Sequence, residues 1–378
     1  MVLSAGLIGY GKRGEVLARI IREHVPEIEI VGVADPDQER RKHASFRHKI
    51  VASEKYTFAT AQELFDKFIP AVSIIATNPP QHCELAVMAA ERGCHIFCEK
   101  PLALSPDEAD RMVAAARKAG VVSAVDFETT FADAFHVLEA YIGSEGFGTL
   151  YRFEAIDKGR PPAYDLEECT PHFLQALMHL THSRPVEVFG RVIVDGRNAT
   201  LDDVKLVSEL YPAGRSHGIG MRADSIEATY RFENGVLAHL FLHGLDMDFL
   251  MRAGRDTPPG SEFMALVCYG TRGQIKWHQT STGSVYVKNV PHDLLDEMQW
   301  RPVPSMWRAD SDWVMPTARL LRDFVGAIHD PLRETRPRVS IGAASLVLDM
   351  TLGVYASHLA GRPVALPLVE RRHPLAAR

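Results

Sequence analysis

The chain has 378 residues, of which 46% are hydrophobic, with 42 Lys and Arg against 48 Asp and Glu and a net charge of −6. At roughly 150 residues per domain, this length predicts two domains, each large enough to bury a core. The composition excludes a disordered chain, and the slightly acidic balance lacks the positive field that nucleic-acid binding needs, so no nucleic-acid partner is expected.

Apolar runs and helical stretches alternate through the first third of the chain. They lie at residues 2–8, 15–23, 28–34, 71–77 and 81–92. This alternation is typical of βαβ units around a parallel sheet. Farther along, Ser105, Pro106 and Glu108 predict the start of a helix, and Gly120 predicts its end.

The hydrophobic period becomes strand-like after Asp126. Strands are predicted near residues 149–156, 186–194, 226–232, 236–243 and 263–269, with a hairpin turn at Asn234-Gly235. We therefore predict an α/β architecture followed by α+β. The first domain is predicted to cover residues 1–127 around a parallel sheet. Residues 128–378 are predicted to form a second domain on a large, mostly antiparallel open sheet, with a C-terminal helix at about 341–360 near the domain seam.

A glycine-rich fingerprint opens the chain. Residues 9–14 read Gly-Tyr-Gly-Lys-Arg-Gly, directly after the first predicted strand and before a helix. In that context the glycines permit a tight turn and let the backbone approach a pyrophosphate at the helix N-terminus. Asp35, at the end of the second strand, can accept hydrogen bonds from the adenosine ribose, which favours NAD, or can simply form a turn before Pro36. Arg40 or Lys12 could still accommodate a 2′-phosphate, so NADP stays open.

The tripeptide Glu99-Lys100-Pro101 follows a predicted buried strand, where open α/β sheets have their ligand crevice. Alone it could be a surface ion pair. The chain also contains residues 9–14, Asp35, Thr77-Asn78-Pro79-Pro80 and His82. In the order and spacing of these motifs, the chain resembles the Gfo/Idh/MocA oxidoreductase family. The resemblance implies that residues 1–127 form a Rossmann NAD(P)-binding domain and that residues 128–378 form an open-sheet domain for substrate binding and oligomerisation. It also implies hydride transfer between nicotinamide and a sugar, cyclitol or related polyol. The predicted cofactor-binding residues are Gly9, Tyr10, Gly11, Lys12, Arg13, Gly14, Asp35, Thr77, Asn78, His82, Glu99 and Lys100.

The family pattern also has an aspartate four residues before a histidine, and both join the lysine at the substrate. Here Glu168 and His172 have that spacing, with glutamate replacing aspartate. Thr170 is predicted to cap a helix that starts at Pro171, and the positive helix end disfavours imidazolium at His172. We expect His172 to act as general base, Lys100 to polarise the reacting oxygen, and Glu168 to orient the substrate or His172.

The chain departs from the family pattern at Glu128, where a basic residue is common nearby. Glu128 could bind substrate hydroxyls or be a solvated linker charge. His179 and His182 have a spacing able to hold a metal, but no further ligand completes the set, so no metal is expected. The predicted substrate-binding residues are Lys100, Glu128, Glu168 and His172.

Two other functions stay open: a redox-neutral lyase or glycosidase that oxidises its substrate transiently, and a non-catalytic dinucleotide-sensing regulator.

An open sheet usually needs a cover, so a homo-oligomer, either a dimer or a tetramer, is expected. Apolar runs such as residues 71–76 fall short of the ~20 residues that span a bilayer. Five scattered cysteines without a CxxC pair predict neither disulfides nor a zinc site, and favour the cytoplasm. The tail at 371–378 is predicted to be frayed.

Overall fold

The computed structural model describes residues 2–47, 49–51, 53–157, 166–167, 170–206, 218–221, 223–243, 265–278, 285–289, 301–302, 313–330 and 337–376. The chain forms two compact units. The first comprises Met1–Phe127 and Thr317–Ser345, and the second comprises Glu128–Pro316 and Leu346–Arg378.

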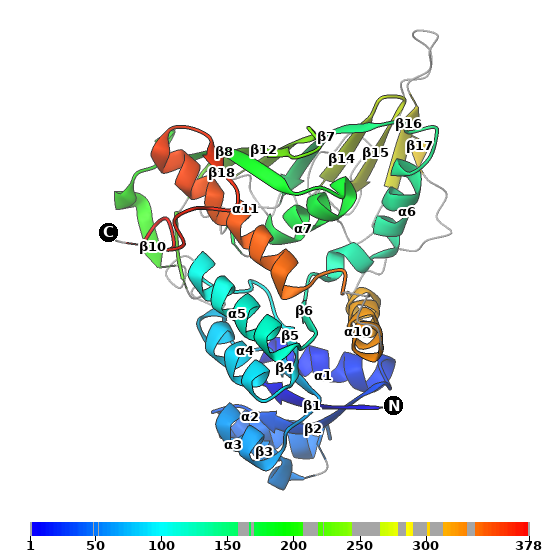
Figure 1. Cartoon of the computed structure of the whole chain (residues 1–378), viewed down its shortest axis with the longest axis vertical. Helices are drawn as coiled ribbons and strands as arrows, with labels where there is room; N and C mark the ends of the chain where they lie inside the picture. The colour runs from blue at the N-terminus through cyan, green and yellow to red at the C-terminus, as the bar shows by residue number, and fades with distance from the viewer. Residues whose placement is uncertain are drawn as a thin grey trace. The chain divides into compact units, whose positions relative to one another are not determined.

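The first unit is built on a parallel six-stranded sheet with the order β3-β2-β1-β4-β5-β6 (Figure 1). The chain order reverses between β1 and β4, and ligands of open α/β sheets bind at the carboxyl ends of the strands beside such a switch point. The strands are β1 (Leu3–Ile8), β2 (Ile28–Ala34), β3 (Thr57–Phe58), β4 (Val72–Ile75), β5 (His95–Cys98) and β6 (Ser123–Val125).

Four of the five helices between these strands bury apolar side chains, whereas the short helix Gln38–Lys42 buries none. On α1, Leu17, Ala18, Ile20 and Ile21 are buried. The predicted helix after Ser105 is confirmed as α5, which ends at Gly120 with a left-handed φ of 64°. Ser105 itself makes no side-chain capping bond. The helices are α1 (Lys12–His24), α2 (Gln38–Lys42), α3 (Ala61–Lys67), α4 (His82–Glu91) and α5 (Pro106–Ala119).

A late segment, Thr317–Ser345, returns to the first unit. It contains most of helix α10 (Val314–His329), whose Phe324 is fully buried and packs on Phe97 with ring centroids 5.9 Å apart. The backbone N–H of Val125 in β6 donates to the carbonyl of Val339 (2.9 Å), which extends the pairing beyond the last strand. The sequence analysis placed this whole segment in the second domain because nothing local marks a contact with residues more than two hundred positions earlier.

The second unit contains a ten-stranded sheet with the order β17-β16-β15-β14-β7-β13-β12-β8-β18, and β9 pairs with β8. Only the β7–β13 pair is parallel within the described part of this sheet, so the predicted fold class is confirmed. The strands are β7 (Leu150–Asp157), β8 (Pro185–Val194), β9 (Arg197–Asn198), β12 (Ser225–Phe232), β13 (Leu237–His243), β14 (Ala265–Gly270), β15 (Gly273–His278), β16 (Val285–Asn289), β17 (Arg301–Pro302) and β18 (Val364–Ala365). A separate pair is β10 (Val204–Leu206) with β11 (Ile219–Met221).

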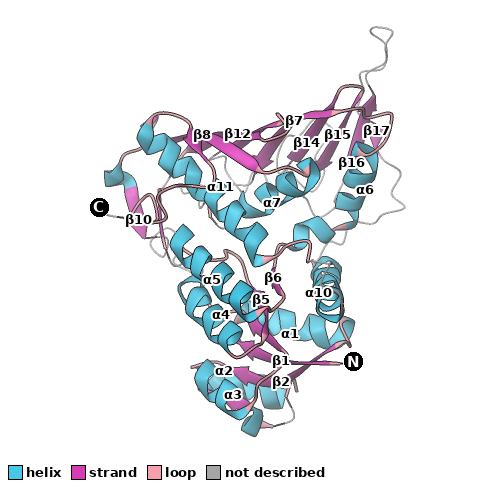
Figure 2. Cartoon of the chain, in the orientation of Figure 1, coloured by secondary structure: helices cyan, strands magenta, loops and turns pink. Residues whose placement is uncertain are grey.

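Helices lie along one face of this sheet, as Figure 2 shows. They are α6 (Asp133–Ile142), α7 (Thr170–Thr181) and, from Leu346 on, α11 (Ile341–Ala360). The approach of α11 is close, because a Cβ added at Gly190 would lie 2.7 Å from the carbonyl oxygen of Val354. The predicted hairpin joins β12 to β13, with Gly235 at φ 84°.

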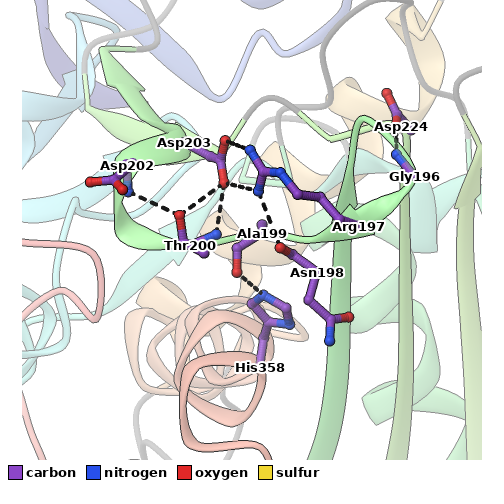
Figure 3. Close-up of polar contacts among 9 residues, drawn as sticks. All are labelled: Gly196, Arg197, Asn198, Ala199, Thr200, Asp202, Asp203, Asp224 and His358. Atoms are coloured by element: carbon purple, nitrogen blue, oxygen red, sulfur yellow. Dashed lines mark hydrogen bonds and ion pairs between the residues drawn. The ribbon is translucent and has the colours of Figure 1, made fainter.

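Polar contacts tie the β9 turn to α11 (Figure 3). Asp203 accepts two bonds of 2.8 Å from Arg197 and one of 2.7 Å from the backbone N–H of Thr200. These bonds hold the pKa of the Asp203 carboxyl well below its usual range. His358 on α11 lies with Nε2 2.9 Å from the carbonyl oxygen of Ala199, so the helix anchors this turn.

The C-terminal segment differs from its prediction. Arg371 donates to Asp349 on α11 (2.6 Å), and the side chain of Leu375 is 4% exposed. His373 lies with Nε2 3.1 Å from Glu167 Oε1 in a buried pair. Up to residue 376 the segment is therefore held by tertiary contacts that local composition did not reveal.

Helix α11 is long and apolar enough to cross a membrane, judged by length and composition among the described residues. A helix was predicted here at about residues 341–360, but no uninterrupted apolar run marks it as long enough to span a bilayer. Its most apolar window is 61% buried inside the structure, which is what a core helix of a folded domain also shows.

Candidate functional site

The turn between β1 and α1 is shaped to let a ligand approach its backbone. Gly9 has φ 91°, and a Cβ there would lie 2.6 Å from the carbonyl oxygen of Ala76. A Cβ at Gly14 would lie 2.1 Å from the carbonyl oxygen of Gly9, whereas one at Gly11 would meet only Arg40, at 3.7 Å. No side chain caps the N-terminus of α1. The residues therefore fit the pyrophosphate of a dinucleotide, as predicted from the glycine spacing.

Asp35 follows β2 and organises the same turn. Its Oδ2 accepts from the backbone N–H of Tyr10 (2.7 Å), and its Oδ1 accepts from that of Asp37 (2.8 Å). The guanidinium of Arg40 lies 3.6 Å from Oδ2. Each carboxylate oxygen has a second lone-pair site, so Asp35 can still accept a ribose hydroxyl. The positive charge of Arg40 beside Asp35 is also compatible with the 2′-phosphate of NADP.

The loops after β4 and β5 carry the next predicted residues. Thr77 is half-buried and Asn78 is exposed, but His82 is fully buried. Its Nδ1 lies 2.9 Å from the carbonyl oxygen of Pro101 and its Nε2 lies 3.1 Å from that of Thr77. Burial lowers the pKa of His82, and a neutral ring donates to one carbonyl at a time. His82 therefore joins the two loops, next to half-buried Lys100, and its predicted contact with the cofactor stays a prediction.

Arg13 links the ends of β5 and β6. Its Nε donates to Glu99 Oε1 (2.5 Å) and its second terminal nitrogen donates to Asp126 Oδ2 (2.6 Å). The backbone N–H of Lys100 donates to the other oxygen of Glu99 (3.3 Å). Sequence reasoning assigned Arg13 and Glu99 to cofactor binding and gave Asp126 no role. The only local signal for Asp126 was its position at the end of a predicted strand.

Burial governs the ionisation of Asp126, whose side chain is fully enclosed. Desolvation raises its pKa to about 7, the positive charge of Arg13 opposes the shift, and the neighbouring Glu99 adds to it. The folded state thus holds this proton more tightly than the unfolded chain does, where the pKa is about 3.8. The stability contributed by the protonated group is complete below about pH 4 and is lost as pH rises through about 7.

We therefore expect Asp126→Asn, which cannot ionise, to flatten part of the pH dependence of stability. Relative to the wild type, the variant should gain stability between pH 5 and pH 8, by an amount on the order of 1 kcal/mol or more. Urea unfolding of both proteins across this range measures the difference. A constant difference at every pH would contradict the assignment.

In the second unit, His172 lies near the N-terminus of α7, which begins at Thr170, one residue earlier than predicted. The Thr170 hydroxyl is buried and makes no hydrogen bond in the described part of the chain, so the expected cap is not seen. The Nδ1 of His172 lies 3.2 Å from Thr129 Oγ1 and 3.8 Å from Glu128 Oε2. The side chains of His172 and Glu128 are 14% and 13% exposed.

The carboxylate beside His172 is thus Glu128, which the sequence analysis offered only as a substrate ligand or a linker charge. Glu168, the predicted partner, lies outside the described residues. Sequence spacing could not find the Glu128 pair, because the two residues belong to different elements: Glu128 begins the short 3₁₀ turn Glu128–Phe131.

Glu128→Gln should lower turnover about 10- to 100-fold, because the amide keeps the size of the side chain but cannot stabilise positive charge on His172. The dissociation constant for NAD should not change. Steady-state kinetics measures turnover, and calorimetric titration measures the dissociation constant for NAD. Glu139→Gln is the matched control, since Glu139 pairs with His179 (2.5 Å) and not with His172; an equal loss in both variants would count against a specific role of Glu128.

His179 and His136 both bond to Glu139, with His136 Nδ1 3.1 Å from Oε2. The ring of His182 lies 5.8 Å from that of His179. Among the described residues, no group of three or more His, Cys, Asp or Glu side chains is arranged to hold a metal ion.

Residues 3–127 match the GFO_IDH_MocA family model, described as an oxidoreductase family with an NAD-binding Rossmann fold. The matched residues make up most of the first unit and contain its glycine-rich turn. The match confirms the resemblance drawn from the motifs, and it confirms NAD as the predicted cofactor.

Two relatives from Bacillus subtilis align with part of the chain. An uncharacterized oxidoreductase is 27% identical over 62% of this chain and 64% of its own length. A scyllo-inositol 2-dehydrogenase (NAD(+)) is 30% identical over 46% of this chain and 50% of its own length. The chain therefore spans between half and two thirds of the length of these relatives.

The structure of levoglucosan dehydrogenase in complex with NADH is similar over both units. The aligned region covers 98% of this chain and 100% of the levoglucosan dehydrogenase chain, with a TM-score of 0.74 and 18% sequence identity. At this identity the likeness shows the fold alone, and it confirms the predicted sequence of a Rossmann domain and an open-sheet domain.

Proposed function

We propose that the protein is an NAD-dependent oxidoreductase that transfers a hydride between nicotinamide and a secondary alcohol or ketone of a sugar, cyclitol or related polyol. The observation that carries the proposal is the position of Lys100. It follows β5 at the carboxyl edge of the sheet, on the side of the switch point away from Asp35. In this fold one half of the dinucleotide binds on each side of that point. The relative named as an inositol dehydrogenase supports the substrate class.

In this proposal NAD, when bound, supplies the hydride acceptor for the alcohol carbon. The Lys100 ammonium polarises the reacting oxygen, and His172 takes the hydroxyl proton. Glu128 stabilises the positive charge that His172 acquires, through the 3.8 Å approach to Nδ1. Glu168 remains a candidate for orienting the substrate, on its spacing from His172 alone.

The test is a panel of inositols, sugars and their keto forms, incubated with NAD or NADP and followed by nicotinamide absorbance. We expect turnover with at least one polyol and a preference for NAD. Tight NAD binding with no change in absorbance across the panel would contradict the proposal, and would point to the dinucleotide-sensing regulator.

A redox-neutral lyase or glycosidase is the second candidate. The pairing of Glu128 with His172 favours it, because a carboxylate beside a histidine provides two groups able to move protons at different steps. Product formation from a glycoside without accumulated NADH would support this reaction over net oxidation.

We also propose a homo-oligomer in which a second copy covers the open face of the large sheet. On that face Phe189 is 47% exposed and Leu237 is 37% exposed, on β8 and β13. The side chains next in sequence, Val188 and Ala238, are fully buried on the helix-covered face. Large exposed apolar side chains on a sheet usually mark an interface.

Light scattering after gel filtration should therefore give the mass of a dimer or tetramer, and Phe189→Asp should shift the protein toward the monomer. A monomeric wild type at micromolar concentration would overturn the proposal.

We further propose a cytoplasmic location, supported by the free thiols of Cys83, Cys94, Cys98 and Cys268.

A further inference from the structure

The cluster of Arg13, Glu99 and Asp126 contains two carboxyl groups and one guanidinium. Glu99 is 5% exposed and Asp126 is fully buried. Asp126 Oδ1 has no hydrogen-bond partner among the described residues, although Oδ2 is bonded to Arg13. A second ionised carboxylate in such a place is costly, because one cation cannot balance both. The geometry thus favours a protonated Asp126 beside the ion pair of Arg13 and Glu99.

The charged and titratable neighbours come from three elements. Helix α1 contributes Arg13, the end of β5 contributes Cys98, Glu99 and Lys100, and the end of β6 contributes Asp126. Burial and the two carboxylates raise the pKa of the Cys98 thiol well above its usual range, so it stays neutral. Burial raises the pKa of Asp126 to about 7, so near neutral pH the proton is bound in about half of the molecules.

The cluster lies at the carboxyl ends of β5 and β6, in the half of the sheet edge where the nicotinamide half of a dinucleotide is expected. Glu99 and Asp126 follow neighbouring parallel strands, since β5 pairs with β6, on the opposite side of the switch point from Asp35. The nicotinamide ring is positively charged in NAD+ and neutral in NADH. A positive charge near a carboxyl group favours its ionised form.

We propose that Arg13, Glu99 and Asp126 form a charge-sensing subsite for the nicotinamide ring, which releases its proton to solvent when NAD+ binds and keeps it when NADH binds. The inference rests on NAD binding to the first unit and not on the substrate reaction. Its consequence is that the oxidised cofactor binds more tightly as pH rises, because the deprotonated cluster carries the charge that balances the ring.

Isothermal titration calorimetry tests this with the full-length chain, NAD+ and NADH, in two buffers of different ionisation enthalpy. At pH 7 we expect release of about half a proton per NAD+ and close to none per NADH. The ratio of NAD+ to NADH affinity should rise about tenfold between pH 6 and pH 8.

Two variants locate the proton. Asp126→Asn, which is isosteric, should abolish both the proton release and the pH dependence of the affinity ratio. Glu99→Gln should move the proton release to lower pH, because it removes the neighbouring negative charge that adds to the shift of Asp126. The matched control is Asp66→Asn, on exposed Asp66 in α3, which should behave as the wild type does.

Equal proton release with NAD+ and NADH, or a difference that survives in Asp126→Asn, would overturn the inference while leaving NAD binding in place. Failure of the wild type to bind either cofactor would overturn the cofactor assignment itself. If Asp126→Asn does not fold, the wild-type comparison and Glu99→Gln still decide the question.

Discussion

Lys100→Met should lower turnover about 10³-fold and leave NAD binding unchanged. Methionine matches the length of lysine but carries no charge, so it cannot stabilise the negative charge that develops on the reacting oxygen. Removal of one such stabilising group commonly costs a factor of about 10²–10³ in turnover. The Lys100 backbone N–H would still donate to Glu99, so the loop should keep its conformation.

The measurement compares turnover, on the polyol that the panel identifies, with the dissociation constant for NADH followed by its fluorescence. Lys118→Met, on the exposed last turn of α5, is the matched control and should keep full activity. Full turnover by Lys100→Met would reject the role given to Lys100. A parallel loss of NADH binding would instead support the cofactor contact that was also predicted for Lys100.

Gly14→Ala should weaken NAD binding at least about 100-fold. The added Cβ would lie 2.1 Å from the carbonyl oxygen of Gly9 and 3.0 Å from its carbonyl carbon. Both are backbone atoms that no rotamer change can move, so the whole turn must shift. Displacements of about 1 Å at a binding site can cost a factor of about 10². Overpacking of this kind also destabilises a fold by roughly 1–3 kcal/mol.

Gly326→Ala is the matched control in the same unit. Gly326 lies within α10, and a Cβ there would have no atom within 4 Å. Because alanine forms helix more readily than glycine, this variant should gain about 0.5–1 kcal/mol of stability and bind NAD normally. Calorimetric titration and thermal unfolding measure both effects. Normal NAD affinity in Gly14→Ala would show that the turn does not approach the pyrophosphate.

Features encoded over a few neighbouring residues were predictable. The glycines of residues 9–14 are required by the backbone of one turn, and the hairpin at Asn234-Gly235 by another. Helix α5 follows from a proline at its start and a glycine just after its end. Such signals are local, because positive φ, ring constraints and hydrophobic period act on the residue and its immediate neighbours. They were sufficient for the fold class and for NAD.

Pairings between distant residues were not predictable in this way. Arg13 and Asp126 are 113 positions apart. They meet because β6 lies beside β5 and the N-terminus of α1 faces the ends of those strands. His172 is 43 positions from Thr129 and approaches Glu128 for the same kind of reason. Glu168 was predicted instead because the family pattern has a carboxylate four residues before the histidine.

By itself, the sequence determined an NAD-binding domain followed by an open-sheet domain, since periodicity and turn chemistry are properties of short segments. Only the tertiary structure decided which charges share a buried space. Asp126 pairs with Arg13, and His82 contacts two backbone carbonyls. The segment Thr317–Ser345 belongs to the first unit. The physical reason is that ionisation and hydrogen bonding depend on burial and on neighbours in space, which are fixed only after strand order and packing are set.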